Sequence, residues 1–210
     1  MKDSFLWRMN FLKRPFDLIL SGAGIILSFP IWVVIMGLIL LDDGWPVFYC
    51  QERVGRRGQR FKVIKFRTMI REAEEAGEPV QATENDPRVT RVGRWLRKTA
   101  LDELPQLVNI FCGQMSFVGP RALRPQEKEV WGDKVVPLSQ VPGYHRRHQV
   151  LPGLTGLAQV YLPADAPRRK KLKYDLLYVK KRSFWLDIKL IILSFWITFR
   201  GRWESREKKI

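Results

Sequence analysis

The longest apolar segment of the chain lies near its N-terminus. Residues 18–41 include no charged side chain, and their length exceeds the roughly 20 residues that cross a bilayer core as a helix. A signal peptide fits less well, because the segment is too long and no small-residue cleavage site follows it. The pattern therefore predicts a helix that enters a membrane.

The flanks of this segment and a proline near its middle bear on how it sits in a bilayer. Lys13 and Arg14 precede it and several arginines follow it at 53–60, so the positive-inside rule places both ends in the cytoplasm. Pro30 removes a helix hydrogen bond, and Ser28 can satisfy a freed carbonyl nearby. These features favour a re-entrant helix hairpin with its kink at Ser28 and Pro30. The alternative is a kinked spanning helix with its N-terminus outside.

Shorter patterns fill the rest of the chain. Aromatic and β-branched residues at 46–51 and 61–66 flank a glycine-containing turn and predict a small β-hairpin with a basic tip. Residues 71–87 are acidic and polar, which predicts a surface flap, and residues 88–111 have helical periodicity. Residues 184–199 combine apolar positions with tryptophans and are followed by a cationic tail. They predict an interfacial amphipathic helix, with a buried core helix as the alternative.

These elements define the expected architecture. The fold class is α+β and mainly helical, with a re-entrant membrane helix, a small β-hairpin and interfacial helices around the active site. We expect a membrane anchor at 1–44, a catalytic domain at 45–200 that includes the interfacial helix 184–199, and a basic tail at 201–210. An exposed apolar face would serve either a homodimer or the bilayer.

Charge narrows the class of partner. Lysine and arginine number 37 against 21 aspartates and glutamates, a net charge of +16, which indicates nucleic acid, anionic lipid or a phosphorylated substrate. The two cysteines, Cys50 and Cys112, form no metal-binding pattern and fit reduced thiols.

Two adjacent carboxylates, Asp102 and Glu103, stand inside the otherwise apolar sequence LDELPQL at 101–107. Carboxylates in such surroundings need a cation, a metal or an open cleft. Thr99 is the expected N-cap of a helix that carries both acids in its first turn, where the helix dipole keeps a carboxylate ionised. Carboxylates also bind Mg²⁺, which in turn binds diphosphates.

Several cations are candidates for phosphate binding. Arg121 follows a rigid Gly-Pro pair, which suits bidentate contact with phosphate. Lys65 and Arg67 lie on either side of Phe66 at the end of the second predicted strand, and a place on an exposed edge strand explains them equally well. A carboxylate near such cations and Mg²⁺ can attack phosphorus. Together with the membrane helix, these residues indicate phosphoryl-type transfer to a lipid.

Seven blocks of sequence, in order, resemble the catalytic domain of the bacterial sugar transferases known as monotopic phosphoglycosyl transferases. The resemblance runs from about Lys13 to Thr198. The blocks are KRPFD at 13–17, PVF at 46–48 with QERVG at 51–55, KFRTM at 65–69, DPRVTRVG at 86–93, LDELPQL at 101–107, MSFVGPR at 115–121 and PGLTGLAQV at 152–160.

The resemblance implies a specific reaction at the cytoplasmic face of the bacterial inner membrane. A sugar-1-phosphate would pass from a UDP-sugar to undecaprenyl phosphate with release of UMP, by a ping-pong mechanism with Mg²⁺ as cofactor. Asp102 would be the nucleophile, and Glu103 would bind the metal or position the lipid phosphate. Arg97 and Arg121 match family positions that contact phosphate, with Lys65 and Arg67 expected in the same site. The re-entrant helix is also a family feature.

The sequence departs from the family pattern at four places. Phe29 rather than serine precedes the kink proline, Ala122 replaces a proline after Arg121, Gln114 stands where an acid is common, and Leu151 stands where an arginine is common. The chain also lacks the extra transmembrane helices of larger relatives, so we expect a minimal catalytic unit.

Two other functions compete with transfer of a sugar-1-phosphate. The first is a membrane-bound basic protein that binds nucleic acid or lipid without catalysis. Nucleic acid is not expected as a partner, because a pattern of exposed aromatic residues interleaved with basic ones, as single-strand binding needs, is not evident in the run at 88–98. The second is a glycosyltransferase that moves a sugar without its phosphate and so releases UDP rather than UMP.

Overall fold

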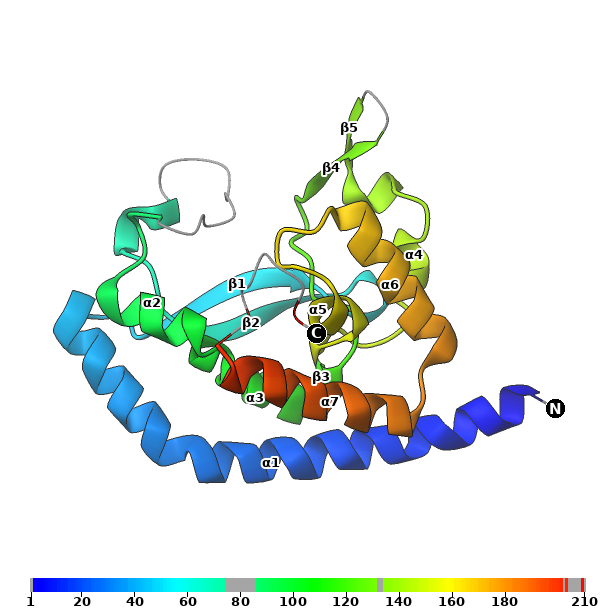
Figure 1. The fold of residues 1–210 in the computed structure, drawn as a ribbon, viewed down its shortest axis with the longest axis horizontal. Coiled ribbons are helices and arrows are strands. Elements are labelled where there is room, and N and C mark those ends of the chain that lie inside the picture. Colours follow the sequence, from blue (N-terminus) through cyan, green and yellow to red (C-terminus); the bar gives the residue numbers. More distant parts are fainter. Residues whose placement is uncertain (1, 75–85, 132–133, 202, 204–208, 210) are drawn as a thin grey trace.

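The computed structural model describes residues 2–74, 86–131, 134–201, 203 and 209 (Figure 1). Most of the predicted acidic flap at 71–87 and of the basic tail lies outside these residues. The described part is a mainly helical α+β structure with a long N-terminal helix and three two-stranded sheets. The coarse fold prediction is therefore confirmed.

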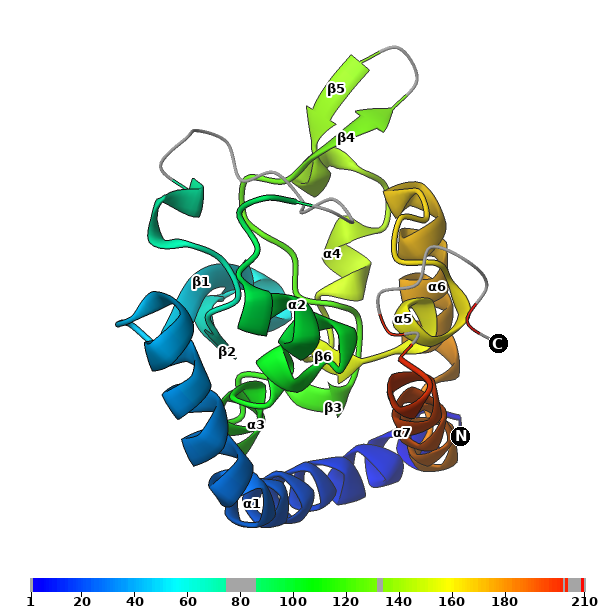
Figure 2. The same ribbon diagram turned by 60° about the vertical axis from the view of Figure 1, so that its left-hand side comes forward.

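A single bent helix, α1 (Lys2–Asp43), runs beneath the rest of the molecule (Figures 1 and 2). Pro15 and Pro30 lie inside it, and the Ser28 hydroxyl donates to the Gly24 carbonyl at 2.6 Å while accepting from Trp32 Nε1 at 2.9 Å. A proline and a serine bonded four residues back both bend helices. A bent helix of this kind suits both predicted topologies, so the re-entrant arrangement stays a prediction.

The composition and exposure of α1 fit a helix in contact with lipid. Residues Phe11–Asp43 are long and apolar enough to cross a membrane, with a mean hydropathy of 2.6 over the most apolar window. Only 17% of that window is buried inside the protein, whereas the core helix of a soluble protein would be mostly buried. The outward face of α1 is therefore available to a bilayer.

The sheets are small. Strands β1 (Phe48–Val54) and β2 (Arg60–Phe66) form the predicted hairpin, antiparallel from the pair Phe48 and Phe66 to the pair Val54 and Arg60. Strand β3 (Ser116–Val118) pairs in parallel with β6 (Gly153–Thr155), and β4 (Lys128–Trp131) pairs antiparallel with β5 (Lys134–Pro137).

Short helices surround these strands, and two longer ones follow. The short ones are α2 (Arg91–Lys98), α3 (Gln106–Phe111), α4 (Tyr144–Arg147) and α5 (Leu157–Tyr161). Helices α6 (Arg168–Lys181) and α7 (Phe184–Phe199) are longer, and α7 lies alongside the N-terminal arm of α1 (Figures 1 and 2). The 3₁₀ turns are η1 (Arg56–Gly58), η2 (Arg71–Glu74), η3 (Leu101–Glu103) and η4 (Leu138–Gln140).

The two arms of α1 pack against different parts of the core. Leu20 and Ile25 lie against a cluster built from α3, β3, α6 and α7. Trp32, Ile35 and Ile39 belong to a second cluster, with Phe66 of β2 and Leu96 of α2 among its buried residues. The bend between the arms lets one apolar helix cover both clusters, which places the β1–β2 hairpin and α3 directly above the helix.

Polar contacts fix the N-terminal arm, and they account for the KRPFD block. Lys13 forms an ion pair with Asp187 of α7, and Arg14 donates to the carbonyls of Ile110 and Phe111 at the end of α3. The buried Asp17 carboxylate accepts from the backbone N–H of Phe117 at 3.2 Å. Each residue therefore ties α1 to a different element of the domain.

We predict that Gly93→Ala lowers the free energy of unfolding by about 3 kcal/mol, because overpacking against backbone cannot be relieved by a rotamer change. A Cβ at Gly93 would lie 2.1 Å from the Thr68 carbonyl oxygen. Denaturant unfolding in detergent micelles measures the loss. Gly37→Ala is the matched control, because a Cβ there meets nothing within 4 Å. Equal unfolding midpoints for the two variants would contradict the prediction.

Candidate active site

The two carboxylates lie in η3, the 3₁₀ turn between α2 and α3. Asp102 and Glu103 are only 9% and 5% exposed. The turn begins after Ala100, whose φ of 55° is left-handed, and it closes through the Leu104 N–H bonded to the Leu101 carbonyl at 3.2 Å. Adjacent carboxylates are thus held in a tight turn inside the protein.

The predicted N-cap at Thr99 is wrong. Thr99 is the C-cap of α2, and its hydroxyl donates back to the carbonyl of Trp95. Thr90 is the N-cap of α2, and its side chain accepts from the Gly93 N–H. The left-handed Ala100 and Pro105, which directly precedes α3, bound the dyad turn, so the second helix of the predicted block at 88–111 starts at Gln106 and not after Thr99. The dyad therefore precedes α3 and is not in its first turn.

Two cations from distant parts of the chain hold Glu103. Lys65 Nζ of β2 lies 2.6 Å from Glu103 Oε1, and Arg121 Nη2 lies 2.9 Å from the same oxygen. Lys65 Nζ is also 3.7 Å from Asp102 Oδ2. Burial raises the pKa of Glu103, but the charges of Lys65 and Arg121 and their hydrogen bonds outweigh it and lower this pKa to about 2. Glu103 is therefore ionised at neutral pH.

The position of Arg121 depends on two glycine-containing loops that interlock. The Gly119 N–H donates to the Thr155 carbonyl at 2.9 Å, and the Gly153 N–H donates to the Pro120 carbonyl at 3.0 Å. A Cβ at Gly153 would lie 2.0 Å from the backbone nitrogen of Gly119. The two backbone segments therefore approach too closely for any residue other than glycine at position 153. The MSFVGPR and PGLTGLAQV blocks are thus two halves of one support for Arg121.

A buried ion pair behind Arg121 was not among the predicted site residues. Arg147 of α4 is 2% exposed, and its Nη2 lies 2.9 Å from Asp175 Oδ2 of α6. The same Nη2 donates to the Arg121 carbonyl at 2.7 Å. Burial raises the pKa of Asp175, and the nearby Arg147 opposes this. A sequence signal existed, since Asp175 lies three residues from both Leu172 and Tyr178 on the inward face of α6.

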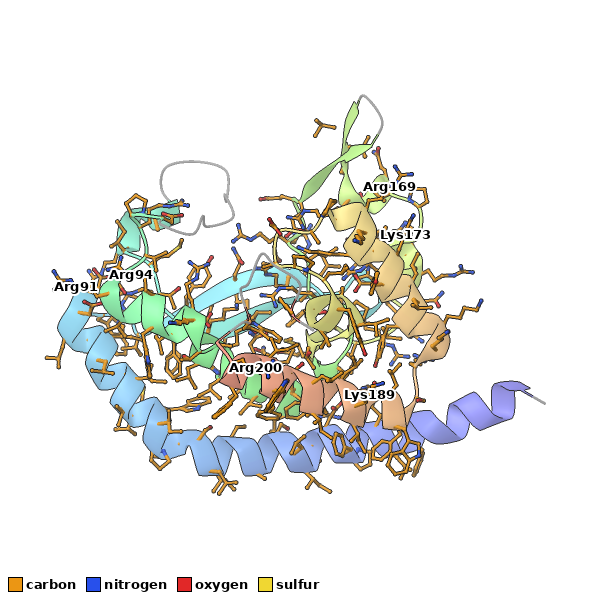
Figure 3. The ribbon with its side chains drawn as sticks, viewed as in Figure 1. Arg91, Arg94, Arg169, Lys173, Lys189 and Arg200 are labelled. Carbon is orange, nitrogen blue, oxygen red and sulfur yellow. The ribbon has the colours of Figure 1, made fainter. Side chains whose placement is uncertain are left out.

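The other two predicted phosphate-binding residues are Arg67 and Arg97. The buried Arg67 donates to the carbonyls of Asp43 and Gly44 at 2.9 and 2.7 Å, where α1 ends. Arg97 lies near Asp86, whose pKa is lowered to about 2 by its hydrogen bond with Arg88 and by smaller effects that include the Arg97 charge. Arg91 and Arg94 lie in the part of α2 farther from α3 (Figure 3). Of the predicted cations, Lys65 and Arg121 form ion pairs with Glu103.

The dyad fits the usual manner of magnesium binding. Mg²⁺ is commonly held by one or two protein carboxylates together with substrate phosphates and water. Asp102 and Glu103 supply two adjacent carboxylates, and Glu103 is ionised. Within the residues that the structure describes, no group of three or more His, Cys, Asp or Glu side chains could enclose a metal by itself, so a metal here would be shared with substrate.

The fold and this site identify the class of protein once the sequence is compared with known families. The model of the family "Bacterial sugar transferase" matches residues 8–201. The chain belongs to this family. The family resemblance read from the sequence blocks is confirmed.

Several curated relatives are similar over most of this chain. A UDP-glucose:undecaprenyl-phosphate glucose-1-phosphate transferase of Klebsiella pneumoniae is 42% identical over 95% of this chain and 42% of its own length. The exopolysaccharide production protein ExoY of Rhizobium meliloti is 38% identical over 85% of this chain and 81% of its own. A UDP-galactose-lipid carrier transferase of Erwinia amylovora is 37% identical over 91% and 41%. The chain thus spans about two fifths of the length of the glucose and galactose transferases that it matches.

We predict that Glu103 contributes to the dependence of stability on pH. Its folded-state pKa of about 2 lies below the ordinary value of 4.5, so its stabilisation is complete above pH 4.5 and is lost as pH falls through about 2. Glu103→Gln should make the fall in unfolding free energy between pH 4.5 and 2 shallower. Glu52→Gln, which changes an exposed carboxylate, should keep the wild-type slope. Parallel slopes for wild type and Glu103→Gln would contradict this.

We also predict that Arg147→Met destabilises the fold by about 3–5 kcal/mol, because it leaves Asp175 buried without its cation. The double variant Arg147→Met with Asp175→Leu should recover most of the loss, since neither charge then remains. Unfolding free energies of the wild type, both single variants and the double variant give the coupling. Additive losses would show that the two side chains do not depend on one another.

Proposed function

We propose that this chain transfers a sugar-1-phosphate from a UDP-sugar to undecaprenyl phosphate and releases UMP, the first membrane step in building a glycan. The observation that carries the proposal is the buried Asp102 next to a Glu103 that Lys65 and Arg121 clamp. The printed names of relatives support it: they include glucose, galactose and N-acetylgalactosamine phosphotransferases. Because these names differ in the sugar, the proposal extends to a UDP-sugar and no further.

The proposed reaction has two displacement steps at one phosphorus atom. An Asp102 carboxylate oxygen attacks the phosphorus that carries the sugar, and the bond from this phosphorus to the bridging oxygen breaks. The electron pair stays on that oxygen, which leaves as part of UMP, so the sugar phosphate remains on Asp102 as an acyl phosphate. An oxygen of undecaprenyl phosphate then attacks the same phosphorus, and Asp102 departs as a free carboxylate.

Asp102 and Glu103 are suited to different roles. One Glu103 oxygen accepts from two cations, which fixes this side chain and makes its lone pairs less available for attack. The Lys65 ammonium lies 3.7 Å from Asp102 Oδ2, beyond ordinary hydrogen-bond length. Lys65 and Arg121 would also offset phosphate charge in the transition state. Mg²⁺ held by Asp102 and Glu103 would supply Lewis-acid stabilisation of the diphosphate.

The membrane supplies the acceptor, and two helices offer surfaces for it. Phe29 and Leu27 on α1 are 58% and 79% exposed, and Trp185 and Phe199 on α7 are 74% and 87% exposed. The Arg200 guanidinium lies 4.4 Å from the centre of the Trp196 ring, an arrangement suited to an anionic interface. We propose that α1 is re-entrant, that α7 is interfacial, and that the domain faces the cytoplasm at the bacterial inner membrane. The homodimer that the sequence left open as a partner is not supported by the relatives' names.

The proposal predicts that Asp102→Asn abolishes UMP release from every UDP-sugar that the wild type uses, because an amide does not form the acyl phosphate. Glu103→Gln should lower turnover by at least about 100-fold, through loss of the clamped charge. Mass spectrometry of the wild type without acceptor should find a phosphosugar on Asp102. Glu52→Gln is the control and should keep full activity. Full activity in Asp102→Asn, or release of UDP, would overturn the mechanism.

A further inference from the structure

Positive charge is concentrated around the loop that follows Arg121. The Val54 N–H donates to the Leu123 carbonyl at 2.8 Å, so this loop lies against the end of β1. Arg53 Nη1 donates to the Ala122 carbonyl at 3.1 Å. Arg168, the first residue of α6, forms an ion pair with Glu127 at the end of the loop. Strand β1, the loop and α6 thus bring their cations to one place.

These cations are close enough to oppose one another's charge. The pKa of Arg53 is lowered to about 10 by burial and by the charges of Arg121 and Arg124. Lys171 is in the first turn of α6, and burial lowers its pKa, as do the charges of Arg168 and Arg121. Glu127 opposes both shifts, Asp165 also opposes the second, and Tyr49 the first. Within the described residues, the cations gathered here outnumber the nearby carboxylates. They are Arg53, Arg121, Arg124, Arg168 and Lys171.

Such a cluster suits a phosphate, and its location indicates which phosphate. Arg121 belongs both to the cluster and to the Glu103 clamp, so an anion bound here lies next to the reacting centre. Helix α6 begins on the side of the molecule opposite α1 and only its end approaches α7 (Figure 1). The lipid acceptor comes from the side of α1 and α7, so the nucleotide is the anion that can reach the cluster from the aqueous side.

We propose that Arg124 and Lys171, with Arg53 beside them, form a subsite for the phosphate of the departing nucleotide. This inference rests on the proposed function and assigns a task to residues outside the dyad and its clamp. The subsite would hold the phosphate that leaves as UMP while Arg121 faces the phosphate that Asp102 attacks. The bridging oxygen gains negative charge when its bond breaks, and nearby cations stabilise that charge. The same contacts make UMP a product that competes with the donor.

The experiment measures binding of UMP to the full chain in detergent micelles by equilibrium dialysis. Arg124→Gln and Lys171→Gln should each weaken binding about tenfold, the usual effect of losing one charge-assisted hydrogen bond. Arg124→Lys keeps the charge and should stay within about threefold of the wild type. Arg169→Gln and Lys173→Gln alter exposed cations on the same helix (Figure 3) and should bind UMP as the wild type does.

Turnover assays separate this inference from the proposed function. In active protein, Arg124→Gln and Lys171→Gln should raise the KM for the UDP-sugar and the inhibition constant for UMP, and leave the KM for undecaprenyl phosphate within about twofold. Unchanged UMP binding in both variants would overturn the subsite even if the wild type releases UMP. A changed KM for the lipid alone would also overturn it. If no UDP-sugar is turned over, the proposed function fails, and the dialysis result still decides whether the nucleotide subsite exists.

Discussion

The pairing of one carboxylate with two cations is the interaction on which this structure depends. Glu103 is almost fully buried, and an ionised carboxylate at such a position is stable only when charges and hydrogen bonds replace water. Lys65 supplies one partner from β2, and Arg121 supplies the other from the loop after β3. The hairpin, the dyad turn and the β3 loop must therefore all be in place before the centre exists.

The surrounding structure fixes the position of Arg121. Two loops interlock through glycines whose backbones almost touch, and a buried arginine on α4 holds the Arg121 carbonyl. That arginine is itself anchored by Asp175 of α6. These contacts fix the backbone of Arg121, and its side chain is held by Glu103. A cation held in place before substrate binds is preorganised for charge that develops in a transition state.

The same elements relate the centre to a membrane. One arm of α1 lies under α3 and α7, and the other lies under the β1–β2 hairpin. Phe66, which packs on this second arm, directly follows Lys65 in β2. Arg67 extends this link, since it binds the carbonyls where α1 ends. The apolar helix thus packs directly beneath the strand that carries one of the two cations of the clamp.

The sequence by itself determined the local features with strong signals: the long apolar helix, the hairpin and the family, and it singled out Asp102 and Glu103 as candidate residues. These follow from composition, alternation and blocks of residues that are read along the chain. Only the tertiary structure decided which cations meet the acids, because Lys65 and Arg121 lie 38 and 18 residues from Glu103. It also showed that Thr99 lies at the end of a helix and not at the start of one, because the left-handed Ala100 ends α2 before the dyad. The Arg147–Asp175 pair joins residues of two helices. The α6 pattern places Asp175 on an inward face, but only long-range contact makes Arg147 its partner.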